Sequence, residues 1–125
     1  MYKPASFSTV SPYLIVNDAA DTIAFLKTVF GAEVLRTFDG PNGKVRHSEV
    51  RIDDTIVMVA DAMPGWPPGT AHLHVYVADV DAAYARALKA GATSVQAPEK
   101  RDDEDKRGGV KDASGTTWWI ATKVE

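Results

Sequence analysis

The sequence predicts a single α+β domain built from two tandem βαβββ units. Its 125 residues fit one domain, because domains usually hold about 100–150 residues. The stretch LIVNDAADTIAFLKTVFGAEV, from Leu14, matches VYVADVDAAYARALKAGATSV, from Val75, which indicates an internal repeat. We therefore expect unit one at about 7–62, a linker at about 62–70 and unit two at about 71–125.

The repeat keeps a nearly constant offset, so each half is the same supersecondary unit. The glycines after the two helices, Gly31 and Gly91, are 60 positions apart, which means that one residue is lost inside the second helix. Elsewhere the offset is 61, in the pairs Leu14 and Val75, Val16 and Val77, Asp18 and Asp79, Ala24 and Ala85, Thr55 and Thr116, and Ala60 and Ala121.

Unit one opens with the alternating strand YLIVND, and Asp18 is typical of a helix N-cap. Apolar residues then recur at helical spacing, at Ile23, Leu26 and Phe30. Gly31 suits the left-handed conformation that often ends a helix. Three further strands are expected in EVLRTF, KVRHSEVRI and TIVMVAD, with PNG and Asp53-Asp54 as the turns.

Unit two repeats this order. The strand HLHVYVAD leads to Asp79, and Val80, Tyr84 and Leu88 predict the buried face of the helix, which Gly91 follows. Strands are expected in TSVQA, near VKD and in TTWWIAT. The charged stretch EKRDDEDKRGG reads as a solvated loop, and the linker DAMPGWPPGT is rich in turn residues.

The two units are similar to the vicinal oxygen chelate superfamily, which includes glyoxalase I, extradiol (ring-cleaving) dioxygenases and bleomycin-resistance proteins. The segments HLHVYVADVDAAYARALKAGA and DKRGGVKDASGTTWWIAT carry the resemblance, which covers essentially the whole chain. It implies curled mixed sheets, with helices on the convex side and the ligand site inside. It also implies a homodimer whose cavities combine a unit from each chain. It does not fix the function, since one fold hosts many chemistries.

Strand alternation predicts which side chains face that cavity. If Asp53-Asp54 is a two-residue turn, Glu49 lies opposite Met58 and Val50 lies opposite Val57, with the valines beneath the helix. One continuous pocket is then expected from the inward-facing residues Tyr13, His47, Glu49, Met58, His72, His74, Tyr76 and Trp119.

Three side chains near this pocket have two interpretations each. Trp66 is either a lid over the cavity mouth or an aromatic residue of a turn. Trp119 either stacks on a planar ligand or fills the pocket. Arg107 either clamps an anionic or carbonyl group of a ligand or stabilises a turn.

The metal positions implied by the resemblance fall on Ser11, Met58, His72 and Trp119, of which His72 alone could be a ligand. Catalytic zinc normally needs about three protein ligands, so we expect the standard site to be absent. The metal-capable side chains His47, Glu49, His72 and His74 have two interpretations, a non-standard divalent metal site or the hydrogen-bonding groups of a polar pocket. We expect the second, with no cofactor.

Composition excludes several classes of function. The net charge of −3 and the scattered basic residues argue against nucleic-acid binding. The absence of cysteine excludes disulfides and a cysteine nucleophile. No apolar run is long enough to span a membrane and no signal peptide is evident, so a cytoplasmic protein is expected.

The sequence leaves three functions open. The first is a metal-independent protein, similar to bleomycin-resistance proteins, that binds a planar or aromatic compound and confers antibiotic resistance. The second is a glyoxalase-, lyase- or dioxygenase-like enzyme, with His47 and Glu49 as the catalytic candidates. In that case Glu49 is a general base with a raised pKa, unless His47 or Arg51 pairs with it. The third is a regulatory or structural member without activity.

Overall fold

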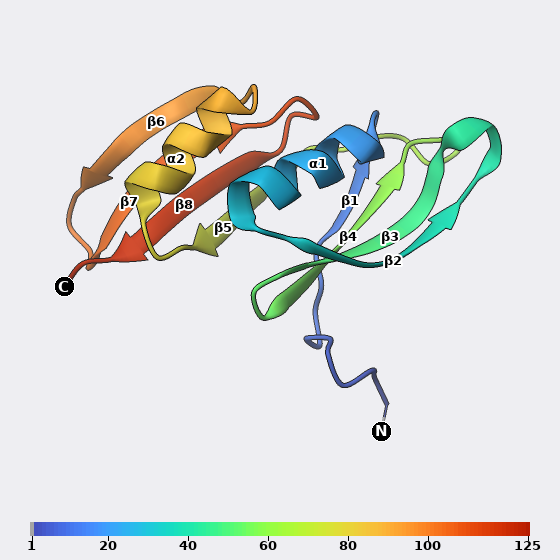
Figure 1. Cartoon of the computed structure of the whole chain (residues 1–125), viewed down its shortest axis with the longest axis horizontal. Coiled ribbons are helices and arrows are strands. Elements are labelled where there is room, and N and C mark those ends of the chain that lie inside the picture. Colours follow the sequence, from blue (N-terminus) through green and yellow to red (C-terminus); the bar gives the residue numbers. More distant parts are fainter. Residues whose placement is uncertain (1) are drawn as a thin grey trace. The chain divides into compact units, whose positions relative to one another are not determined.

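A computed structural model of the chain describes residues 2–125 and contains two compact units. Unit one comprises the described residues up to Lys27 and Gly31–Gly69, and unit two comprises Thr28–Phe30 and Thr70–Glu125. Each unit holds one α-helix and a four-stranded mixed sheet (Figure 1). The expected α+β fold of two βαβββ units is confirmed.

Unit one has the strand order β1-β4-β3-β2, in which β1 runs parallel to β4 and the other neighbours are antiparallel. A short turn of 3-10 helix, Pro41–Gly43, connects β2 to β3. The elements are β1 (Tyr13–Val16), α1 (Ala19–Phe30), β2 (Glu33–Asp39), β3 (Val45–Ile52) and β4 (Thr55–Asp61).

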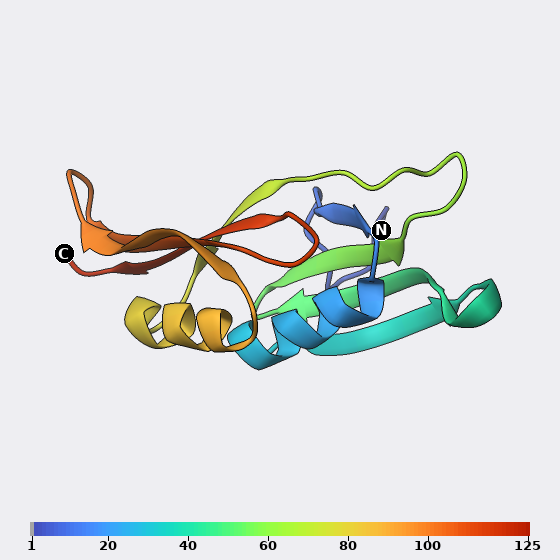
Figure 2. The same cartoon turned by 90° about the horizontal axis from the view of Figure 1, so that it is seen from above.

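Unit two has the corresponding order β5-β8-β7-β6, with β5 parallel to β8. Figure 2 shows α2 along one face of this sheet. The elements are β5 (His72–Tyr76), α2 (Val80–Lys89), β6 (Thr93–Lys100), β7 (Asp105–Lys111) and β8 (Thr117–Lys123).

The predicted register of the β3–β4 hairpin is confirmed. Glu49 lies opposite Met58 and Val50 lies opposite Val57. Val50 and Val57 are buried, whereas Met58 is half-buried. The side of this sheet that carries Glu49 and Met58 is therefore the face opposite α1.

Both helices begin as the sequence predicts. The side chains of Asp18 and Asp79 each accept a hydrogen bond from a backbone N–H of the first helical turn, at 3.1 Å. These bonds satisfy amides that have no partner within the helix. Gly31 ends α1 in the left-handed conformation, with φ of 66°.

A buried carboxylate joins the start of α1 to the start of β3. Asp61 accepts hydrogen bonds from the backbone N–H groups of Ala19 (2.8 Å) and Val45 (2.6 Å) through its two oxygens. Both carboxylate oxygens of Asp61 thus bind backbone amides. One of these amides belongs to Val45, the first residue of the strand that carries His47 and Glu49.

The predicted buried face of the second helix is wrong in part. Val80 is buried as expected, but the rest of the buried face is Ala83 and Ala87, while Leu88 is exposed. The prediction selected the large apolar residues of the helix. In the structure, small alanine side chains face the sheet instead.

The prediction of a solvated loop over the charged stretch 99–109 is also wrong for most of its length. Strand β6 continues to Lys100 and β7 begins at Asp105. Charges are tolerated in these strands because they pair across the ladder or reach solvent, and Asp105 is itself buried. Only residues 101–104 connect the two strands.

Each unit has a register shift near the start of its second strand. In β2, Val34 lies opposite Val50, but Arg36 lies opposite Glu49, so one extra residue is inserted at Leu35. In β6, the same shift occurs between Ser94 and Gln96. Such a bulge redirects the side chains that follow it to the other face of the sheet.

Candidate functional site

Four aromatic rings form a row across the face opposite α1, which we call the aromatic row. It runs from Phe38 on β2 through His47 on β3 and Tyr13 on β1 to Trp66 in the loop after β4. Successive ring centroids are 6.1, 5.5 and 6.5 Å apart. Three of these side chains are well exposed: Trp66 at 47%, Tyr13 at 42% and Phe38 at 38%.

The loop after β4 holds Trp66 in place by a backbone bridge. The N–H of Met63 donates to the carbonyl oxygen of Trp66, and the N–H of Trp66 donates to that of Met63. Trp66 therefore belongs to a turn, as one of the two interpretations expected, and its ring lies beside Tyr13. Its role as a lid over a cavity stays a prediction.

A buried carboxylate lies beside the row. Glu49 is 5% exposed and accepts two hydrogen bonds from Arg36, at 2.9 and 3.1 Å. Its Oε2 atom also lies 3.1 Å from Nε2 of His47. The Arg36 hydrogen bonds hold the pKa of Glu49 below its ordinary value, against the opposite effect of burial.

Of the two interpretations of Glu49, a general base with a raised pKa or a paired carboxylate, this geometry favours the paired carboxylate, because the pKa is lowered. The predicted partner His47 does contact Glu49, but Arg51 pairs with Glu33 instead, at 3.0 Å. Arg36 was missed, because only the bulge at Leu35 brings it opposite Glu49.

Phe38 was also missed as a member of the site. The guanidinium groups of Arg36 and Arg46 lie 5.2 and 5.5 Å from the centroid of its ring. A cation above an aromatic face is a favourable contact. Simple alternation along β2 does not predict that Phe38 lies on this face, because the bulge at Leu35 changes the face of the residues that follow it.

In unit two, a tryptophan occupies the position that Met58 has in unit one. Trp119 on β8 lies opposite His74 and Gly109, and its benzo ring rests on Gly109. Its Nε1 atom donates a hydrogen bond to Nδ1 of His72 at 3.1 Å, and the two rings are nearly parallel. The half-buried indole therefore presents a flat apolar surface.

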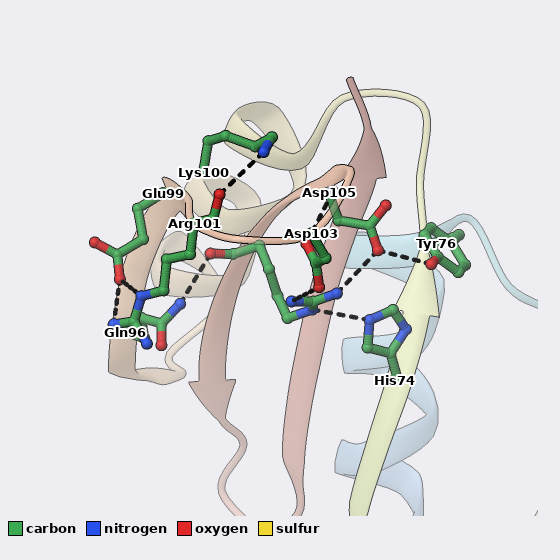
Figure 3. Close-up of polar contacts among 9 residues, drawn as sticks. His74, Tyr76, Gln96, Glu99, Lys100, Arg101, Asp103 and Asp105 are labelled. Carbon is green, nitrogen blue, oxygen red and sulfur yellow. Dashed lines mark hydrogen bonds and ion pairs between the residues drawn. The ribbon is translucent and has the colours of Figure 1, made fainter. Parts of the chain in front are cut away.

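A polar cluster in unit two includes His74, which lies opposite Trp119 in the β5–β8 register (Figure 3 shows the cluster). Arg107 donates to Nε2 of His74 at 3.0 Å, to Asp105 at 2.9 Å, and pairs with Asp103 at 3.1 Å. Tyr76 donates to the same oxygen of Asp105 at 2.7 Å. Burial and the Arg107 charge lower the pKa of His74, and the bond to Asp105 raises the pKa of Tyr76.

The guanidinium of Arg107 is thus engaged by an imidazole and two carboxylates of the chain. Whether it also holds an anionic or carbonyl group of a ligand stays a prediction. The other oxygen of Asp105, Oδ1, is buried and has no hydrogen-bond partner within residues 2–125. A buried acceptor without a partner carries a desolvation cost.

The residues at the metal positions of the superfamily do not fit a metal ion. His72 already accepts a hydrogen bond from Trp119 at Nδ1, while Met58 and Ser11 offer a thioether and a hydroxyl. Among residues 2–125, no three His, Asp or Glu side chains gather closely enough to hold a metal. His47, Glu49 and His74 have protein partners of their own.

The predicted site residues thus form separate groups within the units. Tyr13, His47, Glu49 and Trp66 come together in unit one. In unit two, His72 contacts Trp119, and His74 contacts both Tyr76 and Arg107. The single pocket that would combine both groups stays a prediction.

These features define a duplicated α+β protein that carries polar and aromatic side chains on sheet faces turned away from its helices. The chain belongs to the Glyoxalase/Bleomycin resistance protein/Dioxygenase superfamily, whose family model matches residues 7–120.

Relatives of known sequence or structure agree with this assignment. An uncharacterised protein of Mycobacterium bovis is 39% identical over 128 aligned positions, and the alignment covers 92% of this chain and 83% of the relative. TnmS3, an antibiotic binding protein from Streptomyces sp. CB03234, is 25% identical, with a TM-score of 0.71 and coverage of 97% of this chain and 99% of that one. TioX from Micromonospora sp. ML1 has the same fold, with a TM-score of 0.77, 24% identity and coverage of 93% and 98%.

None of the helices within residues 2–125 has the length and apolar character needed to cross a membrane.

Proposed function

We propose that this chain is a small-molecule-binding protein that takes a planar or aromatic ligand without a metal ion, as bleomycin-resistance-type members of the superfamily do. The aromatic row carries the proposal. It presents three exposed rings and one imidazole on one face of a sheet. Exposed aromatic surface is hydrated unfavourably, and its burial against a ligand or a protein surface would be favourable. The likeness to TnmS3 favours an antibiotic as the ligand.

Unit two carries a second surface suited to a planar compound. The half-buried indole of Trp119 rests on Gly109 and offers a flat stacking surface.

The proposal includes a homodimer in the cytoplasm. Exposed aromatic residues on a sheet face favour burial against a second protein surface or a ligand. A second copy of the chain would bury part of this area and enclose the ligand.

Tryptophan fluorescence tests the proposal. Planar compounds (an acridine, a phenazine and an anthraquinone) should quench saturably, with the same midpoint before and after dialysis against a chelator. Tyr13→Ala or Trp66→Ala should weaken binding by about 1–3 kcal/mol, the range found when aromatic stacking partners are removed. Tyr84→Ala, whose ring lies on α2, is the matched control. Equal affinities for all variants, or loss of binding after chelation, would contradict the proposal.

An enzyme with a non-standard His/Glu site is the second candidate. The contacts among Tyr13, His47 and Glu49 favour it, because they order a hydroxyl, an imidazole and a carboxylate. Elemental analysis of protein purified without chelators separates a metal-dependent version from a metal-free one.

A further inference from the structure

We propose that Tyr13, His47 and Glu49 form a proton relay through which the Tyr13 phenol removes a proton from an acidic C–H group of a planar ligand. The proposal rests on the ligand site proposed above and adds a reaction to it. The relay uses side chains from β1 and β3 that meet on the face opposite α1.

The contacts follow one another in a chain. The Oη atom of Tyr13 lies 3.1 Å from Nδ1 of His47, and Nε2 of His47 lies 3.1 Å from Oε2 of Glu49. Arg36 then donates to both oxygens of Glu49. A hydroxyl, an imidazole and a buried carboxylate in this order are the parts of a general-base relay.

The protonation state follows from the donors and acceptors available. Glu49 is ionised because Arg36 holds it, and an ionised carboxylate can only accept hydrogen bonds. Nε2 of His47 must therefore carry a proton, which leaves Nδ1 of the neutral ring as an acceptor. The Tyr13 hydroxyl then donates to Nδ1, and its oxygen lone pairs are left to accept a proton from outside.

The proton transfer balances without another reactant. The ligand C–H proton moves to Oη of Tyr13, while the phenol proton moves to Nδ1 of His47. The electron pair of the C–H bond stays on the ligand, as a carbanion or in a bond that forms as a leaving group departs. The charge of Glu49 stabilises the imidazolium, which later loses its proton to water.

The surroundings of His47 allow this role. The charged and titratable groups that face it are Tyr13 from β1, Arg36 from β2 and Glu49 from β3, with Arg46 beyond the ring of Phe38. On β4, Met58 lies opposite Glu49 and does not titrate. Tyr13 is exposed and lies between His47 and Trp66, so a ligand stacked on the row would reach its oxygen.

The second unit shows that the fold alone does not produce a relay. His74 and Arg107 occupy the repeat positions of Tyr13 and His47. There Arg107 donates to the imidazole, and an arginine cannot give up its proton. Within residues 2–125, His74 has no carboxylate on its other nitrogen, so the relay belongs to unit one.

A reactive probe tests the chemistry without knowledge of the natural ligand. A nitrobenzisoxazole is a planar carbon acid that opens to a coloured phenolate when a base removes its proton. We expect the protein to accelerate this reaction, and Tyr13→Phe and His47→Gln each to lower the second-order rate constant by about 100-fold. Tyr84→Phe, which removes a phenol bonded to Ser94, should keep the full rate. Tyr13→Phe with an unchanged rate would overturn the proposal.

Glu49 is a positioning residue, and the pH profile tests it. The relay needs an Nδ1 atom without a proton, so we measure the second-order rate constant as a function of pH. Glu49→Gln removes the charge that stabilises the imidazolium, so the pH profile of the rate constant should move to lower pH. Arg51→Gln is the control, because it breaks the exposed ion pair with Glu33 between β3 and β2. This substitution should not move the pH profile. An unmoved profile in Glu49→Gln would contradict the relay.

A measurement on the unaltered protein guards against variants that misfold. The carbon-13 signal of the Tyr13 Cζ atom should change over the same pH range as the rate constant, because the hydroxyl stops donating when Nδ1 gains a proton. The Tyr76 signal should show no such step.

A flat Tyr13 signal means that the relay is wrong. If acridine still quenches saturably, the ligand site stands without the relay. If no planar compound quenches saturably, the proposed function itself fails.

Discussion

The indole of Trp119 rests directly on Gly109, so that a Cβ atom at position 109 would lie 2.7 Å from Cζ3 of the indole. Gly109→Ala must therefore displace the ring. We expect the free energy of unfolding to fall by about 1–3 kcal/mol, the usual cost of overpacking, and planar ligands to bind more weakly. Urea denaturation and fluorescence titration measure the two effects. Gly69→Ala, where nothing lies within 4 Å, is the control.

Removing the ring itself separates binding from folding. Trp119→Ala should weaken planar ligands by about 1–3 kcal/mol if they stack on the indole. His72→Ala should change the free energy of unfolding by less than about 0.5 kcal/mol, because this histidine is exposed and its bond to Trp119 is replaced by water. Calorimetric titration and urea denaturation test these expectations. Full ligand affinity in Trp119→Ala would show that the indole only fills space.

Glu49 should make stability depend on pH. Its pKa is lower in the folded chain than in the unfolded chain, so its contribution is present above the ordinary value of 4.5 and is lost as pH falls through the lower folded value. Glu49→Gln should reduce the free energy of unfolding at neutral pH by about 1–3 kcal/mol. Urea denaturation at a series of pH values measures this effect. The difference in the free energy of unfolding between Glu49→Gln and the unaltered protein should become smaller at pH values below the ordinary pKa of glutamate. Glu33→Gln, which alters an exposed pair, should show little of this trend.

Asp61 should be important for folding and not for binding. Asp61→Asn keeps the size but turns one acceptor oxygen into a donor, which then faces a backbone N–H group. We expect a loss of about 1–3 kcal/mol in the free energy of unfolding, with unchanged ligand affinity once folded. The exposed Asp39→Asn is the matched substitution on β2. A stable Asp61→Asn protein would mean that these two bonds contribute little.

The assembly can be tested directly. We expect a homodimer, because exposed aromatic residues on a sheet face are a liability for an isolated chain. Sedimentation at micromolar concentration should show twice the mass of the chain. A stable monomer under these conditions would argue decisively against the dimer.

Local rules predicted most of the fold. The helix caps at Asp18 and Asp79 depend on side chains next to the backbone they satisfy. The Asp53-Asp54 turn fixed the β3–β4 register, because a two-residue connection permits only one pairing across the hairpin. These features involve residues that are close in sequence.

The missed partners depend on long-range geometry. Arg36 reaches Glu49 only because of the bulge at Leu35. The alternation of apolar and polar residues in EVLRTF does not predict this inserted residue. Asp105 is tolerated in a strand because Tyr76 and Arg107 satisfy one of its oxygens. Sequence spacing alone does not reveal that these side chains meet.

The bulge occurs at the same repeat position in both halves, in β2 and in β6. An inserted residue moves the side chains that follow it to the other face of the sheet, so each second strand exchanges its two faces part-way along its length. In β2 this exchange brings Arg36 opposite Glu49, and in β6 it brings Gln96 opposite Gly109. The same backbone irregularity therefore forms an ion pair in one half and places an uncharged side chain opposite a glycine in the other.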